Sequence, residues 1–215
     1  MAEESLRKSV VLAEWLSRQI AGTRLAGDVR TRAAAVCFGV ALEHHAAIVT
    51  LLRLAMPLYS SVFALGRPLF EAYVRAMWIS LCATDKQIES YLQGRIPDMA
   101  SLIAALQKLQ GGNEISSLRK IYDTSWRAMS GLTHTGAEHL ERWGTGEVLE
   151  PDFQPDDVAR ILDFSARIGT LSTMGIAMLS KDDPELWKRV REESRQLMPP
   201  RYDAKRFGPL TPQTR

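Results

Sequence analysis

No stretch of this sequence alternates apolar and polar residues as a half-buried β-strand would. The residues that start and end its segments are instead typical of helices. Asp28 is a suitable N-cap, Pro57 ends the apolar segment after it, and Thr84 begins a capping box. The chain has 215 residues, 46% hydrophobic and 24% charged, which suffices for one globular domain with a sizeable core. We therefore expect an all-α fold, a multi-helix bundle that is antiparallel in its core.

Capping and proline signals place the expected helices along the chain. These helices cover residues 3–20, 28–56, 58–83, 84–93, 97–109, 113–132, 155–179 and 183–198, and Pro68 is expected to kink the third. Thr135 and Glu138 have capping-box spacing, which predicts a further helical turn. We expect residues 1–198 to form a single helical bundle domain and residues 199–215 to form a Pro-rich, basic tail that is extended or disordered.

The chain carries the features of a cytoplasmic protein. Cys37 and Cys82 stand alone on apolar stretches, so no disulfide is expected and a reducing compartment is favoured. The first residues lack the basic-then-apolar order of a signal peptide. Charges interrupt the most apolar segments, residues 33–54 and 58–83, and each would cost about 2.5–3.5 kcal/mol at bilayer depth, so no membrane span is predicted. The net charge of +2 neither requires nor excludes nucleic acid.

Two groups of polar residues fall on otherwise apolar helices. His44 and His45 both point toward the predicted packed side of their helix, either as hydrogen-bonded core histidines or as the lining of a functional pocket. Arg67, Glu71 and Arg75 are spaced by four and share one line of the next helix. This line predicts either a solvated ion-pair strip or a buried network that fixes how the two helices meet.

The helix that begins at residue 113 has a clear polar face opposite its apolar stripe. On that face lie Lys120, Asp123, Thr124 and Arg127. If the helix continued, His134 would fall at nearly the same angle as Arg127, after about 10.5 Å of helical rise. Long side chains converging over that gap can grip one phosphate, and Asp123 can orient the Arg127 guanidinium.

The string from Arg127 to His134, RAMSGLTH, is an arginine followed by six residues and a histidine near a helix end. It resembles the motif of the HEPN superfamily, helical bundles that include bacterial ribonucleases of toxin–antitoxin and phage-defence systems. The strings at residues 67–75 and 132–139 also look like uncharacterised bacterial helical families near HEPN, so the likeness covers residues 36–143. It implies an antiparallel four-helix core and a homodimer in which two motifs form one RNA-cleaving site.

The resemblance assigns roles to particular residues. His134 would transfer the proton of the RNA 2′-hydroxyl, and Arg127 would hold the scissile phosphate in a forked contact. We count Asp123, Ser130, Glu138 and His139 as supporting residues. Such a site yields a 2′,3′-cyclic phosphate without a metal or other cofactor, and its partners would be RNA, a second copy and an antitoxin or other protein.

Two alternatives belong to other functional classes. Active HEPN members carry a polar residue after the arginine, where this chain has Ala128, so the bundle is alternatively a catalytically inactive interaction module. A metal-binding bundle would use carboxylates and histidines such as Glu43, Glu71 and His134. However, neither the Glu-x-x-His pair of di-iron bundles nor His-Glu-x-x-His occurs, so no metal is predicted.

Overall fold

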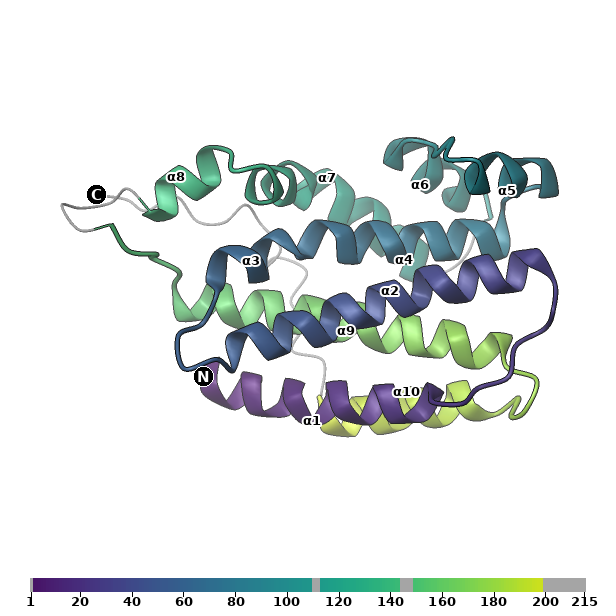
Figure 1. Ribbon diagram of the computed structural model, residues 1–215, viewed down its shortest axis with the longest axis horizontal. Helices are drawn as coiled ribbons and strands as arrows, with labels where there is room; N and C mark the ends of the chain where they lie inside the picture. Colours follow the sequence, from purple (N-terminus) through teal and green to yellow (C-terminus); the bar gives the residue numbers. More distant parts are fainter. Residues whose placement is uncertain (1, 110–112, 144–148, 199–215) are drawn as a thin grey trace.

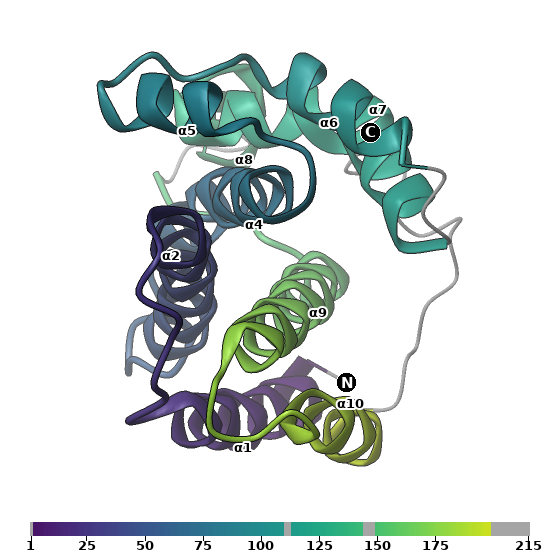
Figure 2. The ribbon, with the colours of Figure 1, turned by 90° about the vertical axis from the view of Figure 1, so that its right-hand side faces the viewer.

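The computed structural model describes residues 2–109, 113–143 and 149–198 as an all-helical bundle (Figures 1 and 2). The helices are α1 (Ala2–Ile20), α2 (Val29–Leu52), α3 (Tyr59–Ala64), α4 (Gly66–Leu81), α5 (Asp85–Leu92), α6 (Met99–Gln107), α7 (Asn113–Thr133), α8 (Ala137–Trp143), α9 (Pro155–Leu179) and α10 (Leu186–Leu197). Within these residues no β-strand forms, and β-type pairing is limited to an isolated antiparallel bridge between Leu25 and Ser180. The all-α prediction is confirmed, whereas the predicted tail at residues 199–215 lies outside the described residues.

Local hydrogen bonds explain where several helices begin. The Asp28 carboxylate accepts from the Thr31 backbone N–H at 2.8 Å and so caps α2. At the start of α5, the Gln87 side chain accepts from the Thr84 N–H at 2.8 Å, and the Thr84 hydroxyl accepts from the Gln87 N–H at 3.3 Å. Both predicted caps are therefore confirmed, as are both predicted ends of α9.

Helix α2 packs against α4 and α9, which lie on its inner side (Figure 2). Helices α1 and α10 cover α9, and α6 and α7 lie against α4. Two glycines of α9 allow the close approach of α2. A Cβ at Gly169 would come within 2.6 Å of the His45 ring, and one at Gly175 within 2.5 Å of the Phe38 ring. The spacing of α2 and α9 thus requires residues without side chains at these positions.

Of the described helices, α2 alone is long and apolar enough to cross a membrane by length and composition. In this bundle, 44% of its most apolar window is buried against neighbouring helices. A central helix needs the same composition, because it packs on several sides.

Three expectations about helix boundaries were wrong. The helix expected over residues 58–83 is divided at Leu65 into α3 and α4, and Pro68 lies in the first turn of α4, where its missing N–H costs no hydrogen bond. Helix α2 ends at Leu52, four residues before the predicted end. The further helical turn predicted near Thr135 forms as α8, but it begins only at Ala137, because Thr135 is left-handed, with φ of 56°, and does not cap it.

Candidate functional site

The candidate site lies where α7 ends beside α4. Helix α7 closes with a hydrogen bond from the Gly136 N–H to the Gly131 carbonyl at 2.7 Å, across left-handed Thr135. This six-to-one bond is the Schellman pattern of helix ends, which usually places glycine at the left-handed position. It stops the helix directly after Thr133 and leaves His134 exposed at its end.

His134 contacts an arginine of another helix. The Arg67 Nη1 atom lies 2.9 Å from the His134 Nε2 atom. A guanidinium can only donate hydrogen bonds, so Nε2 of His134 must be the acceptor in this contact. We therefore assign to His134 the neutral tautomer that carries its proton on Nδ1.

Two other side chains hold Arg67 in place. Its Nε donates to a Glu71 oxygen at 2.7 Å, and its guanidinium lies over the Trp126 ring, 4.5 Å from the centroid. The second Glu71 oxygen accepts from Arg75 Nη2 at 2.7 Å. Trp126 in turn contacts Tyr122, with ring centroids 5.2 Å apart. We call Arg67, Glu71, Trp126 and His134 the Arg67–His134 cluster.

The Arg67, Glu71 and Arg75 side chains are only 24%, 16% and 22% exposed. Their ion pairs are therefore partly buried, which is intermediate between the two alternatives expected from the sequence, a solvated strip and a buried network. Partial burial raises the pKa of Glu71, but the hydrogen bonds from Arg67 and Arg75 outweigh burial and the pKa is lowered. Glu71 is therefore a carboxylate at neutral pH. Arg67, Glu71 and Arg75 together carry two positive charges and one negative charge, so this row of α4 beside His134 is attractive to an anion.

Arg127 does not join His134. It is exposed on α7, and within the part of the chain that the structure describes no hydrogen bond or ion pair holds its guanidinium. Asp123, expected to orient Arg127, instead accepts from Arg119 Nε at 2.7 Å. Spacing along one helix pointed to Arg127, whereas Arg67, 67 residues from His134, supplies the contact. The sequence feature that could have indicated Arg67 was the row of charged residues spaced by four in the segment 67–75.

The other expected supporting residues have local roles. The Ser130 hydroxyl donates to the Trp126 carbonyl at 2.8 Å, within α7. The Glu138 carboxylate lies against Gly131, where an added Cβ would be 1.7 Å from its Oε2 atom. The His139 Nδ1 atom is buried and has no hydrogen-bond partner among the described residues. The Ser130 hydroxyl thus contacts the backbone of Trp126, and none of these contacts reaches the side chains of Arg67, Glu71 or His134.

Comparison with known families places most of the chain. Residues 38–200 match a family of unknown function, DUF6988. The chain belongs to the DUF6988 family. Comparisons with curated proteins and with solved structures gave no significant match. The region shared with DUF6988 includes Arg67 and His134.

His45 is a core residue of the DUF6988 chain, with its side chain fully buried between α2 and α9. Its Nδ1 lies 3.2 Å from the Ser165 hydroxyl, which donates its own proton to the Leu162 carbonyl at 3.1 Å. Nδ1 is therefore the donor, and Nε2 is left without a partner among the described residues. Burial lowers the pKa of His45 to about 4. Burial also lowers the pKa of His44, which is half-buried.

A second ionic group, missed in the sequence, joins α8 to α9. Buried Arg142 donates to Asp157 at 2.6 Å, and Arg160 also contacts the Asp157 carboxylate. The Arg142 guanidinium lies 5.6 Å from the Phe153 ring centroid. Because the Arg142 and Asp157 side chains are only 8% and 3% exposed, this group holds two helices together rather than facing a ligand.

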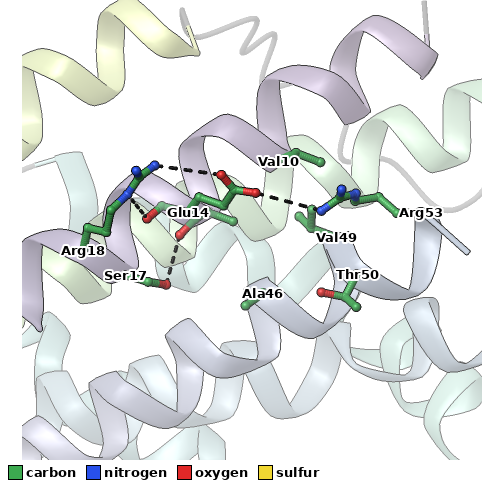
Figure 3. Close-up of a pocket in the computed structure, with 9 residues that line it drawn as sticks. Val10, Glu14, Ser17, Arg18, Ala46, Val49, Thr50 and Arg53 are labelled. Atoms are coloured by element: carbon green, nitrogen blue, oxygen red, sulfur yellow. Dashed lines mark hydrogen bonds and ion pairs between the residues drawn. The ribbon is translucent and has the colours of Figure 1, made fainter.

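An open groove of about 440 Å³ lies between α1 and α2 (Figure 3). Val10, Ala13, Ala46 and Val49 supply its apolar part. Above them Glu14 lies between two arginines, 3.9 Å from Arg18 and 4.0 Å from Arg53. These exposed, loosely paired charges do not converge on one point, and the Arg67–His134 cluster lies outside the groove. Within the described residues, no group of three or more histidines, cysteines and carboxylates is placed to hold a metal ion.

Proposed function

We propose that this DUF6988 chain is a HEPN-like bundle that binds single-stranded RNA and cleaves it without a metal at the Arg67–His134 cluster. In this proposal α1, α2, α4 and α9 correspond to an antiparallel four-helix core. The observation that carries it is the 2.9 Å contact between a donor-only guanidinium and the lone pair of an exposed, neutral imidazole. That arrangement holds a phosphate-binding group and a general base within reach of one phosphodiester.

The first step is recognition of the phosphate. The described contacts of Arg67 use its Nε and Nη1 and leave both Nη2 hydrogens for a ligand. Glu71 and the Trp126 ring fix the plane of the guanidinium, so little side-chain freedom is lost when a phosphate binds. A forked contact to two non-bridging oxygens is the geometry that a guanidinium favours.

The second step is an exchange of hydrogen bonds. The RNA 2′-hydroxyl replaces Arg67 as the donor to His134 Nε2, and the released Nη1 hydrogen turns to the phosphate. His134 takes the proton as the 2′-oxygen attacks phosphorus. The bond to the 5′-oxygen breaks, that oxygen takes a proton from water, the hydroxide so formed takes the proton from His134, and a 2′,3′-cyclic phosphate remains. Arg67 offsets the negative charge that develops on the non-bridging oxygens.

Arg127 has a different role in this proposal. Its exposed guanidinium, without a described partner, is free to bind a neighbouring phosphate of the same strand. It therefore contributes to affinity and to salt dependence rather than to the chemical step. We also propose that the protein acts in the cytoplasm with a second copy and, as the resemblance implies, in a toxin–antitoxin or phage-defence system.

The test is cleavage of a fluorescently labelled single-stranded RNA by the purified full chain in EDTA. We expect a product ending in a 2′,3′-cyclic phosphate and no cleavage of the matching DNA, which lacks the nucleophile. His134→Ala and Arg67→Ala should each lower the rate by about 10²–10⁴-fold. Arg127→Ala should weaken binding and change the rate at saturation little. Arg119→Ala, which removes an exposed arginine of the same helix, is the matched control.

Two outcomes would contradict cleavage at this site. The first is activity that survives His134→Ala in a folded protein. The second is RNA binding without turnover, which favours the inactive interaction module suggested by Ala128 and by the separation of Arg127 from His134. In that case Arg67→Ala should lower affinity while the folded state stays intact.

A further inference from the structure

One face of α2 is exposed although α1, α4 and α9 all pack against this helix. Val29, Val36 and Val40 are 58%, 65% and 39% exposed, and the valine side chains at 36 and 40 are one turn apart. Ala33 and Ala47, both half-buried, continue the same line. Figure 2 shows α2 at the margin of the described helices, with α9 on its opposite side. We call these five residues the α2 stripe.

The spacing of the α2 stripe is that of a helix–helix seam. Its positions, 29, 33, 36, 40 and 47, follow steps of four, three, four and seven, which keep side chains on one face over more than four turns. The structure exposes this apolar line because α4 and α9 cover only part of the circumference of α2.

Two exposed charges flank the stripe. Arg32 and Glu43 lie on the same side of it, and within the described residues neither side chain has an ion-pair partner. They are separated by roughly 16 Å of helical rise and cannot reach one another within one chain. The two positions are nevertheless placed nearly symmetrically about residue 38, the midpoint between Val36 and Val40, because Arg32 lies six residues before it and Glu43 five residues after it.

We propose that the α2 stripe is the interface of a homodimer in which the α2 helices of two copies pack antiparallel. A two-fold axis near residue 38 sets Val36 opposite Val40 and Val29 opposite Ala47. The same axis sets Arg32 opposite Glu43, and symmetry makes this ion pair twice. A second copy is therefore the occupant that matches both the apolar line and its flanking charges. No residue of the stripe belongs to the Arg67–His134 cluster, so the dimer does not depend on the proposed RNA chemistry.

The experiment is sedimentation velocity on the full chain over a wide range of protein concentration. The wild type should convert from monomer to dimer as concentration rises. Arg32→Glu and Glu43→Arg each place like charges opposite one another twice, so each should weaken dimerisation at least tenfold. The double variant restores opposite charges and should recover the wild-type dissociation constant. Such rescue reports pairing between chains, because the two positions are too far apart within one.

A hydrophobic pair of variants completes the test. Val36→Lys should abolish the dimer, whereas Val11→Lys, at a valine of α1 that is 45% exposed outside the stripe, should leave it unchanged. A wild type that stays monomeric at every concentration overturns the proposal. It does so even if the monomer binds lipid vesicles in a separate flotation assay. A dimer unaffected by Val36→Lys, or single charge reversals that the double variant does not rescue, overturns it as well. RNA cleavage plays no part in these readings.

Discussion

Acidification should destabilise this protein through His45, whose imidazole is buried without charge. Burial lowers its pKa from an ordinary value of 6.5 to about 4 in the folded chain. The unfolded chain therefore binds one more proton than the folded chain between these two values. The free energy of unfolding should fall by about 1.4 kcal/mol for each unit of pH in this window. The total loss attributable to His45 is about 3 kcal/mol at pH 4, with no further contribution below.

The assay is urea unfolding followed by circular dichroism at a series of pH values from 7.5 to 4. The decisive quantity is the difference between the wild type and His45→Met, because other titrating groups cancel in that difference. In the variant, the free energy of unfolding should lose the part of its pH dependence that comes from His45. As the pH falls from 6.5 to 4, the stability of the variant relative to wild type should therefore rise by about 3 kcal/mol. His44→Met, at the half-buried neighbour, is the control and should keep most of the slope.

Equal slopes for the wild type and His45→Met would refute the reasoning. Such a result would mean that the folded interior admits the His45 proton at an ordinary pKa. It would require a partner for the Nε2 atom, which has none among the described residues.

Three further substitutions, the first with a matched control, test the helix packing, the backbone and a buried ion pair. Gly175→Ala brings a Cβ within 2.5 Å of Phe38 and should cost about 1–3 kcal/mol in urea unfolding, whereas Gly39→Ala, with no atom within 4 Å, should be neutral or stabilising. Equal losses at both glycines would contradict the close contact of α2 and α9. Thr135→Gly should stabilise the chain by about 0.5–1 kcal/mol, since a β-branched residue is strained at a φ of 56°, and a lower thermal midpoint would argue against that strain. Asp157→Ala should cost about 3–5 kcal/mol because it leaves a buried arginine unpaired, and a loss below 1 kcal/mol would show that this arginine reaches water.

Features that depend on neighbours in sequence could be predicted well. The caps at Asp28 and Thr84 and both ends of α9 follow from side chains within a few residues of the backbone groups they satisfy. Boundaries were wrong where two local rules compete. At Thr135 the six-to-one hydrogen bond that closes α7 prevented the helix start that the capping-box spacing predicted. Near residue 65 the expected helix broke three residues before Pro68, not at the proline itself.

The candidate site was predicted only in part. The sequence pointed to His134 and to the row from Arg67 to Arg75, yet it paired His134 with Arg127 because both fall at one angle of a continued helix. The helix ends at Thr133, so that geometry does not exist. His134 instead meets Arg67, which the packing of α7 against α4 brings beside it.

The chain by itself determined its class. Apolar periodicity and capping residues act over a few positions, and they are sufficient to make this protein helical and to place most helix ends. Tertiary packing alone decided which arginine faces His134, which histidine of α2 is sealed from water, and which side of that helix stays open. These are contacts between segments distant in sequence, and their energies depend on distances and burial that no local pattern encodes.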